Sequence, residues 1–213
     1  DWEQWGHYRF LDAQLYADRI DAWEIGNEPN LIEEWREPPD PAAYARLLEV
    51  AARQIKAADP DAIVVSAGLA PLNARNDPHH LNDLDYLRAM YEHGAADHFD
   101  VLGLHTFGFG RPPEIAPDGA LCPSLLPTGR ETYLRRTGPQ IDRGCQPVEA
   151  LCFRRAEEVR AIMVKFDDGD KPAWATEFGW PTIDGMFVPV SPGQEYAADI
   201  NEGQQADYTV RAL

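Results

Sequence analysis

Two glutamates in this sequence follow apolar runs in the same way, and together they indicate a specific chemistry. Glu28 lies in WEIGNEPN, which runs from Trp23 to Asn30, and Glu177 lies in WATEFGWPT. A pair of carboxylates can hydrolyse a glycosidic bond, because one protonates the leaving oxygen while the other attacks the anomeric carbon or activates a water. A single glutamate after a strand is more often a solvated loop residue or a helix-cap partner. The repetition of the pattern favours the paired chemistry.

Other residues at comparable positions could bind a substrate. Asn27 and His105 also stand at the ends of apolar runs, and an amide that both donates and accepts suits a contact to a sugar hydroxyl. Trp35, Phe107 and Trp180 lie at or after the ends of these runs, where an aromatic face can stack on a sugar ring. For the two tryptophans, simple packing within a loop is an equal alternative.

These side chains need elements that bring them to one place, and the sequence alternates strand-like with helix-like segments. Short runs of β-branched and bulky apolar residues predict strands at about 22–28, 62–68, 100–106 and 172–177. Apolar stripes at spacings of three and four residues predict helices at 8–16, 40–59, 84–94, 148–166 and about 202–213. The polar candidates therefore fall at the C-terminal ends of predicted strands.

This alternation predicts an α/β fold with parallel strands and right-handed crossovers. A doubly wound sheet and a (β/α)8 TIM barrel both fit the order. No G-x-G-x-x-G or G-K-[ST] turn follows a strand, whereas polar residues end several strands, which is where barrel enzymes assemble their sites. We therefore expect a barrel. A full barrel takes about 250 residues, so residues 1–213 predict a single catalytic domain that is a partial barrel of about four βα units.

The segment between Phe107 and Val148 is far longer than an ordinary connection of about 2–6 residues. We interpret residues 107–148 as a loop inserted above the barrel mouth. Cys122 and Cys145 lie within it and are the pair that we expect to form a disulfide, whereas Cys152 belongs to the 148–166 stripe and should face the sheet. Three reduced thiols in a cytosolic protein are the alternative. A disulfide forms in an oxidising compartment, so we expect a secreted or extracellular protein.

The charge and composition of the chain exclude some classes of binding partner. The chain has 36 acidic and 19 basic residues and a net charge of −17, which repels phosphate backbones and anionic membranes, so neither nucleic acid nor a membrane is an expected partner. No apolar run approaches the roughly 18 residues of a membrane span, and Asp1 opens no signal segment. His79 and His80 are adjacent and have no third ligand at a recognisable spacing, so we expect neither a metal nor a cofactor.

Two stretches also resemble a known family. WEIGNEPN resembles the fourth-strand acid/base motif of the retaining clan A glycoside hydrolases, families 5 and 39 especially, and WATEFGWPT resembles their seventh-strand nucleophile motif. The resemblance runs from the helix before the fourth strand to the helix after the seventh. It implies that Glu28 is the general acid/base, that Glu177 is the nucleophile, and that Asn27 contacts the sugar 2-hydroxyl. His105 matches a sixth-strand histidine, and Phe107 stands where many relatives have a tyrosine that contacts the nucleophile.

The resemblance and the residues together lead to one expectation. The protein should cleave β-glycosidic bonds of an oligo- or polysaccharide with retention of configuration, and the Glu28 and Glu177 carboxyl groups should lie about 5–5.5 Å apart, whereas inversion needs up to about 9 Å. A barrel that binds carbohydrate without cleaving it, or a fragment of a larger assembly, is the alternative. The sugar, its linkage, exo or endo action and the oligomeric state stay open.

Overall fold

The computed structural model describes residues 2–72, 78–116, 151–186, 189–190 and 194–213. Their contacts divide the chain into two compact units. Unit 1 comprises Asp1–His105 and Glu158–Glu177, and unit 2 comprises Thr106–Glu157 and Phe178–Leu213. These two units are defined by contacts alone, so the expectation of a single domain over residues 1–213 stays a prediction. Most of the loop predicted at 107–148, with Cys122 and Cys145, lies outside the described residues.

Four strands lie in the described part of the chain: β1 (Ala22–Ile25), β2 (Ile63–Ser66), β3 (Leu102–Phe107) and β4 (Ala173–Gly179). β1 and β2 pair in parallel, with Ala22 opposite Ile63 and Ile25 opposite Ser66. An isolated parallel bridge between Val65 and Val101 joins β2 to the residue before β3. Each strand thus lies beside the one that precedes it in the sequence.

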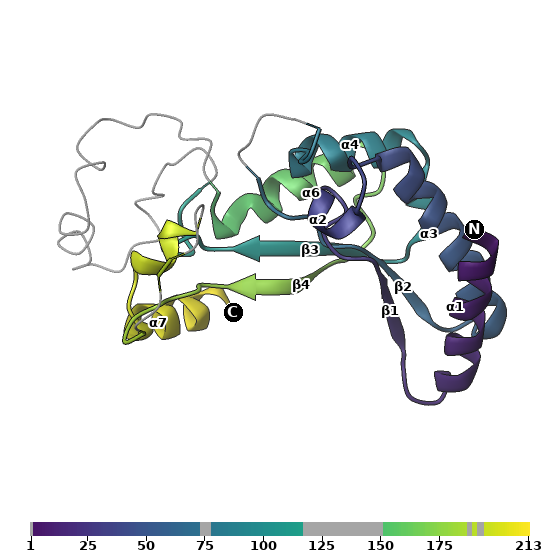
Figure 1. Ribbon diagram of the computed structural model, residues 1–213, viewed down its shortest axis with the longest axis horizontal. Coiled ribbons are helices and arrows are strands. Elements are labelled where there is room, and N and C mark those ends of the chain that lie inside the picture. The colour runs from purple at the N-terminus through teal and green to yellow at the C-terminus, as the bar shows by residue number, and fades with distance from the viewer. Residues whose placement is uncertain (1, 73–77, 117–150, 187–188, 191–193) are drawn as a thin grey trace. The chain divides into compact units, whose positions relative to one another are not determined.

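β3 and β4 form the second pair and also run parallel. The Leu102 N–H donates to the Pro172 carbonyl at the start of the two strands (3.0 Å), and the Gly108 N–H donates to the Gly179 carbonyl just past their ends (2.9 Å). Figure 1 shows the two arrows side by side and pointing the same way. The C-terminal ends of β3 and β4 therefore lie at the same edge.

Several helices begin at residues whose side chains cap them. Asp40 precedes α3, and its carboxylate accepts from the N–H groups of Ala42 and Ala43, while Asn201 and Gln204 form a capping box at the start of α7. No described helix is long and apolar enough to cross a membrane. The helices are α1 (Trp2–Tyr16), α2 (Ile32–Trp35), α3 (Pro41–Ala58), α4 (Asp83–Glu92), α6 (Ala156–Lys165) and α7 (Glu202–Ala212), with 3-10 turns η1 (Ala95–His98), η3 (Phe153–Arg155) and η4 (Glu195–Ala198).

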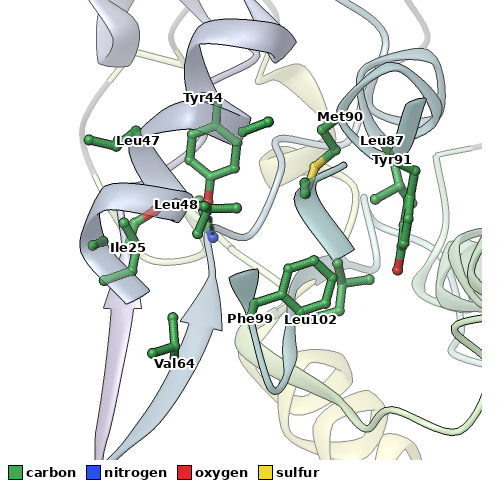
Figure 2. Close-up of a cluster of buried hydrophobic side chains, with 14 of the residues drawn as sticks. Ile25, Tyr44, Leu47, Leu48, Val64, Leu87, Met90, Tyr91, Phe99 and Leu102 are labelled. Carbon is green, nitrogen blue, oxygen red and sulfur yellow. Dashed lines mark hydrogen bonds between the residues drawn. The ribbon is translucent and has the colours of Figure 1, made fainter. Parts of the chain in front are cut away.

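The core of unit 1 lies between the strands and the helices α3 and α4 (Figure 2). Tyr44 in α3 is fully buried, and its hydroxyl donates to the Ile25 carbonyl (2.9 Å) and accepts from the Ala67 N–H (2.6 Å). The end of β1 and the residue after β2 are thus fixed to the same helix. The side chains labelled in Figure 2 are Ile25, Tyr44, Leu47, Leu48, Val64, Leu87, Met90, Tyr91, Phe99 and Leu102.

Unit 2 has a smaller core built around Trp180. Its buried members are Trp180, Ile200 and Tyr208, with Phe153 packed against them. The Arg211 guanidinium pairs with the Glu114 carboxylate (Nε to Oε1, 2.7 Å) and so connects α7 to the segment that follows β3. Aromatic packing and this ion pair hold the unit together.

Two predicted helices differ from the observed ones. α1 begins at Trp2 rather than at Tyr8. In the part of the predicted 148–166 helix that the structure describes, the α-helix begins only at Ala156, and Cys152 has extended backbone angles (φ −154°, ψ 161°) with a buried side chain. The Thr106 hydroxyl donates to the Phe153 carbonyl, and the Phe153 ring stacks on Trp180 at 5.2 Å. These tertiary contacts outweigh the helical pattern of the sequence around Cys152.

Candidate active site

Glu28 lies in a sharp turn directly after β1. The strand ends at Ile25, and both Gly26 (φ 91°) and Glu28 (φ 42°) have backbone angles in the left-handed region, which is costly for a glutamate. The turn is held in place because the Glu28 N–H donates to the Gly68 carbonyl (3.0 Å) and the Glu28 carbonyl accepts from the Leu31 N–H (2.9 Å). Strain of this kind in a non-glycine residue often marks a functional position.

His105 in β3 lies against Glu28. Its Nδ1 is 2.9 Å from Glu28 Oε1, and its Nε2 is 3.8 Å from Glu177 Oε1. The histidine side chain is only 1% exposed, while the Glu28 and Glu177 side chains are 20% and 51% exposed. A buried imidazole therefore lies between two more accessible carboxylates, one from the turn after β1 and one from β4.

Gly68 makes room for this imidazole. A Cβ added to Gly68 would overlap the His105 ring, 2.5 Å from its Nε2, so any side chain at this position would displace the histidine. The same residue supplies the carbonyl that accepts the Glu28 N–H. Gly68 thus fixes both the backbone of Glu28 and the ring beside its carboxylate.

The three side chains converge closely. One ligand-type atom from each of Glu28, His105 and Glu177 lies within 4.8 Å of the other two, so an oxygen of one carboxylate is at most 4.8 Å from an oxygen of the other. Two carboxylates and an imidazole at these distances could also hold a metal ion, although acidic groups this close are common without one. The arrangement as it stands gives two carboxylates near one buried base.

Asn27 and Trp35 lie at a neighbouring cavity in unit 1. Trp35 is partly buried, with its ring stacked on Trp2 at 6.3 Å and edge-on to Tyr44 at 6.3 Å, and Asn27 is exposed. Neither residue is shown in contact with the two carboxylates. The cavity, about 470 Å³, is lined by Trp2, Trp5, Gly26, Asn27, Pro29, Glu34, Trp35, Tyr44 and Leu47.

The structure places Phe107 and Trp180 in unit 2. Trp180 is 2% exposed, its indole N–H donates to the Arg111 carbonyl (2.6 Å), and Phe153 and Tyr208 pack on its ring. Core packing therefore covers the Trp180 ring in this structure, as the alternative of simple packing expects, and a role for this residue in sugar binding stays a prediction. Phe107 is partly exposed and lies edge-on to Phe109 at 6.1 Å, so a role in binding stays a prediction.

Glu24 was not among the site residues predicted from the sequence. This residue lies on β1, and its Oε1 accepts from the Gly68 N–H (3.1 Å) and from the Thr176 hydroxyl (2.9 Å). The signal that could have found it is its position four residues before Glu28, in the middle of an otherwise apolar strand.

The sequence matches no known protein family and no curated protein. Solved structures are similar to it. One is a family 39 glycoside hydrolase from the gut symbiont Bacteroides cellulosilyticus WH2, with a TM-score of 0.53 and 20% identity over 95% of this chain and 32% of that chain. This likeness shows that the chain shares the fold of that part of the enzyme. The chain spans about a third of its length.

Two further similar structures are also glycosidases. AbfB, a family 51 α-L-arabinofuranosidase from Bifidobacterium longum, has a TM-score of 0.44 and 15% identity over 80% of this chain and 29% of that chain. A monomeric β-xylosidase from Caulobacter crescentus CB15 has a TM-score of 0.46 and 21% identity over 84% of this chain and 31% of that chain.

Proposed function

We propose that the protein is a retaining glycoside hydrolase that cleaves β-glycosidic bonds of an oligo- or polysaccharide. The observation that carries this proposal is the separation of Glu28 and Glu177, whose carboxylates approach within 4.8 Å through one oxygen of each. Retaining enzymes hold their two carboxyl groups about 5–5.5 Å apart, because the nucleophile must touch the sugar directly with no intervening water. The fold shared with a family 39 glycoside hydrolase agrees with this proposal.

Glu28 then serves as the acid and Glu177 as the nucleophile. Glu28 protonates the leaving oxygen while Glu177 attacks the anomeric carbon, and Glu28 afterwards removes a proton from the water that releases the sugar. The hydrogen bond between Glu28 and His105 is compatible with Glu28 acting first as an acid and then as a base. Nδ1 can accept from a protonated Glu28 or donate to an ionised one, depending on the tautomer, so the 2.9 Å contact can persist as Glu28 loses and regains its proton.

We also propose that the fold is part of a (β/α)8 barrel. The parallel strands follow one another in chain order, which fits a barrel and lacks the reversal of order found in a doubly wound sheet. Apolar residues of β4 are open to solvent, with Trp174 40% and Phe178 39% exposed. We infer that further barrel strands, from a longer chain, cover such residues.

Mutation separates the two roles. Glu177→Ala should abolish turnover of every aryl β-glycoside, whereas Glu28→Ala should slow substrates with poor leaving groups by about 10²–10⁴-fold and spare those with good ones, because only proton transfer is lost. Azide should rescue Glu28→Ala alone, and the product should keep the β configuration. Glu49→Ala, on an exposed position of α3, is the matched control and should keep full activity.

Two results would refute the proposal. Equal losses in both variants on every substrate, without azide rescue, would remove the assigned roles. A wild-type protein that binds oligosaccharides in calorimetry but cleaves none of a panel of β-glucosides, β-xylosides and β-mannans would instead support a barrel that only binds carbohydrate.

A further inference from the structure

The Glu24 carboxylate on β1 contacts residues in or next to the other three strands. Its Oε1 accepts from the Gly68 N–H (3.1 Å), just after β2, and from the Thr176 hydroxyl (2.9 Å) in β4. The same oxygen would be 3.0 Å from a Cβ added to Gly103 in β3, so the carboxylate lies directly over that glycine. One oxygen of β1 therefore meets residues of the next three strand segments.

Each of the two hydrogen bonds of Glu24 leads to a residue of the candidate site. Gly68 accepts the Glu28 N–H (3.0 Å) and lies under the His105 ring. Thr176 is the residue before Glu177 on the same strand. A hydrogen bond from Thr176 to Glu24 fixes the position of β4 relative to β1, and a bond from Gly68 to Glu24 fixes the turn that holds Glu28.

We propose that Glu24 is a positioning residue that sets the separation between Glu28 and Glu177. The inference rests on the proposed function and adds a residue to it, one that acts through Gly68 and Thr176. An ionised carboxylate strengthens both hydrogen bonds. Because both contacts are made to Oε1, the single carbonyl oxygen of a glutamine can accept the same two bonds, whereas alanine accepts neither.

The first test compares Glu24→Ala with Glu24→Gln. A misplacement of about 1 Å can lower a rate by about 10²-fold, so Glu24→Ala should lower kcat on an aryl β-glycoside by about 10–100-fold, with a smaller change in KM. Glu24→Gln should regain most of kcat. Glu49→Ala is again the control, and thermal unfolding of each variant shows whether it folds.

The second test isolates the contact with β4. Thr176→Val removes the hydroxyl and leaves the Gly68 bond in place, while Thr176→Ser keeps the hydroxyl. Thr176→Val should lower kcat, and Thr176→Ser should not. This pair also keeps the proposal testable if Glu24→Ala fails to fold, since valine and serine both preserve the bulk of the strand to within a methyl group.

The third test does not depend on activity. Crystal structures of Glu24→Ala and Glu24→Gln should show the Glu28 to Glu177 oxygen separation increased beyond 4.8 Å in the first and kept in the second. An unchanged separation in Glu24→Ala overturns the inference, and so does a kcat that Glu24→Gln fails to restore. If the wild-type protein cleaves no glycoside, the proposed function fails, but the separation still decides the role of Glu24.

Discussion

At the scale of single residues, the candidate site depends as much on a missing side chain as on the ones present. Gly68 lies under His105, and no left-handed backbone angle requires glycine there. Its role is therefore steric: it leaves the space that the imidazole fills. Because Gly68 also accepts the Glu28 N–H, a shift of this residue moves two members of the site together.

Replacing this glycine tests the steric role. Gly68→Ala should displace His105, lower the free energy of unfolding by about 1–3 kcal/mol through overpacking, and reduce kcat. Urea denaturation and steady-state kinetics measure the two effects. In a His105→Ala background the added methyl group has space, so the stability cost of Gly68→Ala should shrink in a double-mutant cycle. A cost that is the same in both backgrounds would contradict the steric explanation.

Part of the site follows from the sequence, and the reason is geometric. Glu28, His105 and Glu177 were predicted to meet because parallel strands in a barrel end at one edge, and the structure brings all three within 4.8 Å. Glu24 was missed, since a glutamate in mid-strand looks like the solvent-facing half of an alternating pattern. For Trp180 the sequence left packing and sugar stacking equally open, because its position in a loop does not show which side chains will cover it.

At the scale of elements, Tyr44 connects α3 to the ends of two strands. Its hydroxyl joins the Ile25 carbonyl to the Ala67 N–H, and these residues precede the Glu28 turn and Gly68 respectively. Burial raises the pKa of the Tyr44 hydroxyl far above its usual value, so the group keeps its proton and can donate to Ile25 at any pH near neutrality. The helix thereby holds the backbone on which the site stands.

Removing this hydroxyl should destabilise the protein. Tyr44→Phe leaves a buried carbonyl and a buried N–H without their partner, which should lower the free energy of unfolding by about 1–3 kcal/mol. Tyr86→Phe is the matched control, because Tyr86 is equally buried but its hydroxyl, within the described part of the chain, makes one long contact of 3.4 Å to the Asp40 carbonyl. Urea denaturation of the two variants gives the comparison. If both variants lose the same free energy of unfolding, the contacts of the Tyr44 hydroxyl with Ile25 and Ala67 contribute nothing to stability.

The elements themselves were predicted with uneven success. All four predicted strands are present, with ends shifted by at most a few residues, because short apolar runs between turn signals have few alternatives. The predicted helix at 148–166 was wrong at residues 151–155, where its described part begins. Spacings of three and four around Cys152 match a helix, but the contacts of Phe153 with Thr106 and Trp180 come from distant segments and carry no local signal.

At the scale of the whole molecule, the strand order bears on the choice between a barrel and a doubly wound sheet. Alternation of strands and helices fits a doubly wound sheet as well as a barrel. The structure shows that each strand lies beside its predecessor, which the sequence alone does not reveal. This order agrees with the proposal of a partial barrel. The similarity to about a third of a family 39 glycoside hydrolase points the same way.

The charge of the whole chain leads to a last prediction. With 36 acidic and 19 basic residues, many carboxylates have no basic counterpart, so repulsion among them should oppose the compact state. Salt screens this repulsion over a distance that falls from about 30 Å at 0.01 M to about 10 Å at 0.1 M ionic strength. Exposed ion pairs such as Arg53 with Glu3 weaken in salt as well, but each contributes only about 0–1 kcal/mol.

We therefore expect stability to rise with ionic strength. The urea midpoint at pH 7 should increase between about 0.01 M and 0.15 M NaCl. The slope of the unfolding free energy against urea should stay constant, because salt does not change the area of surface that unfolding exposes. A chain stabilised mainly by its ion pairs would show the opposite shift. A midpoint that falls as salt is added would therefore show that attraction between specific pairs outweighs the repulsion of the net charge.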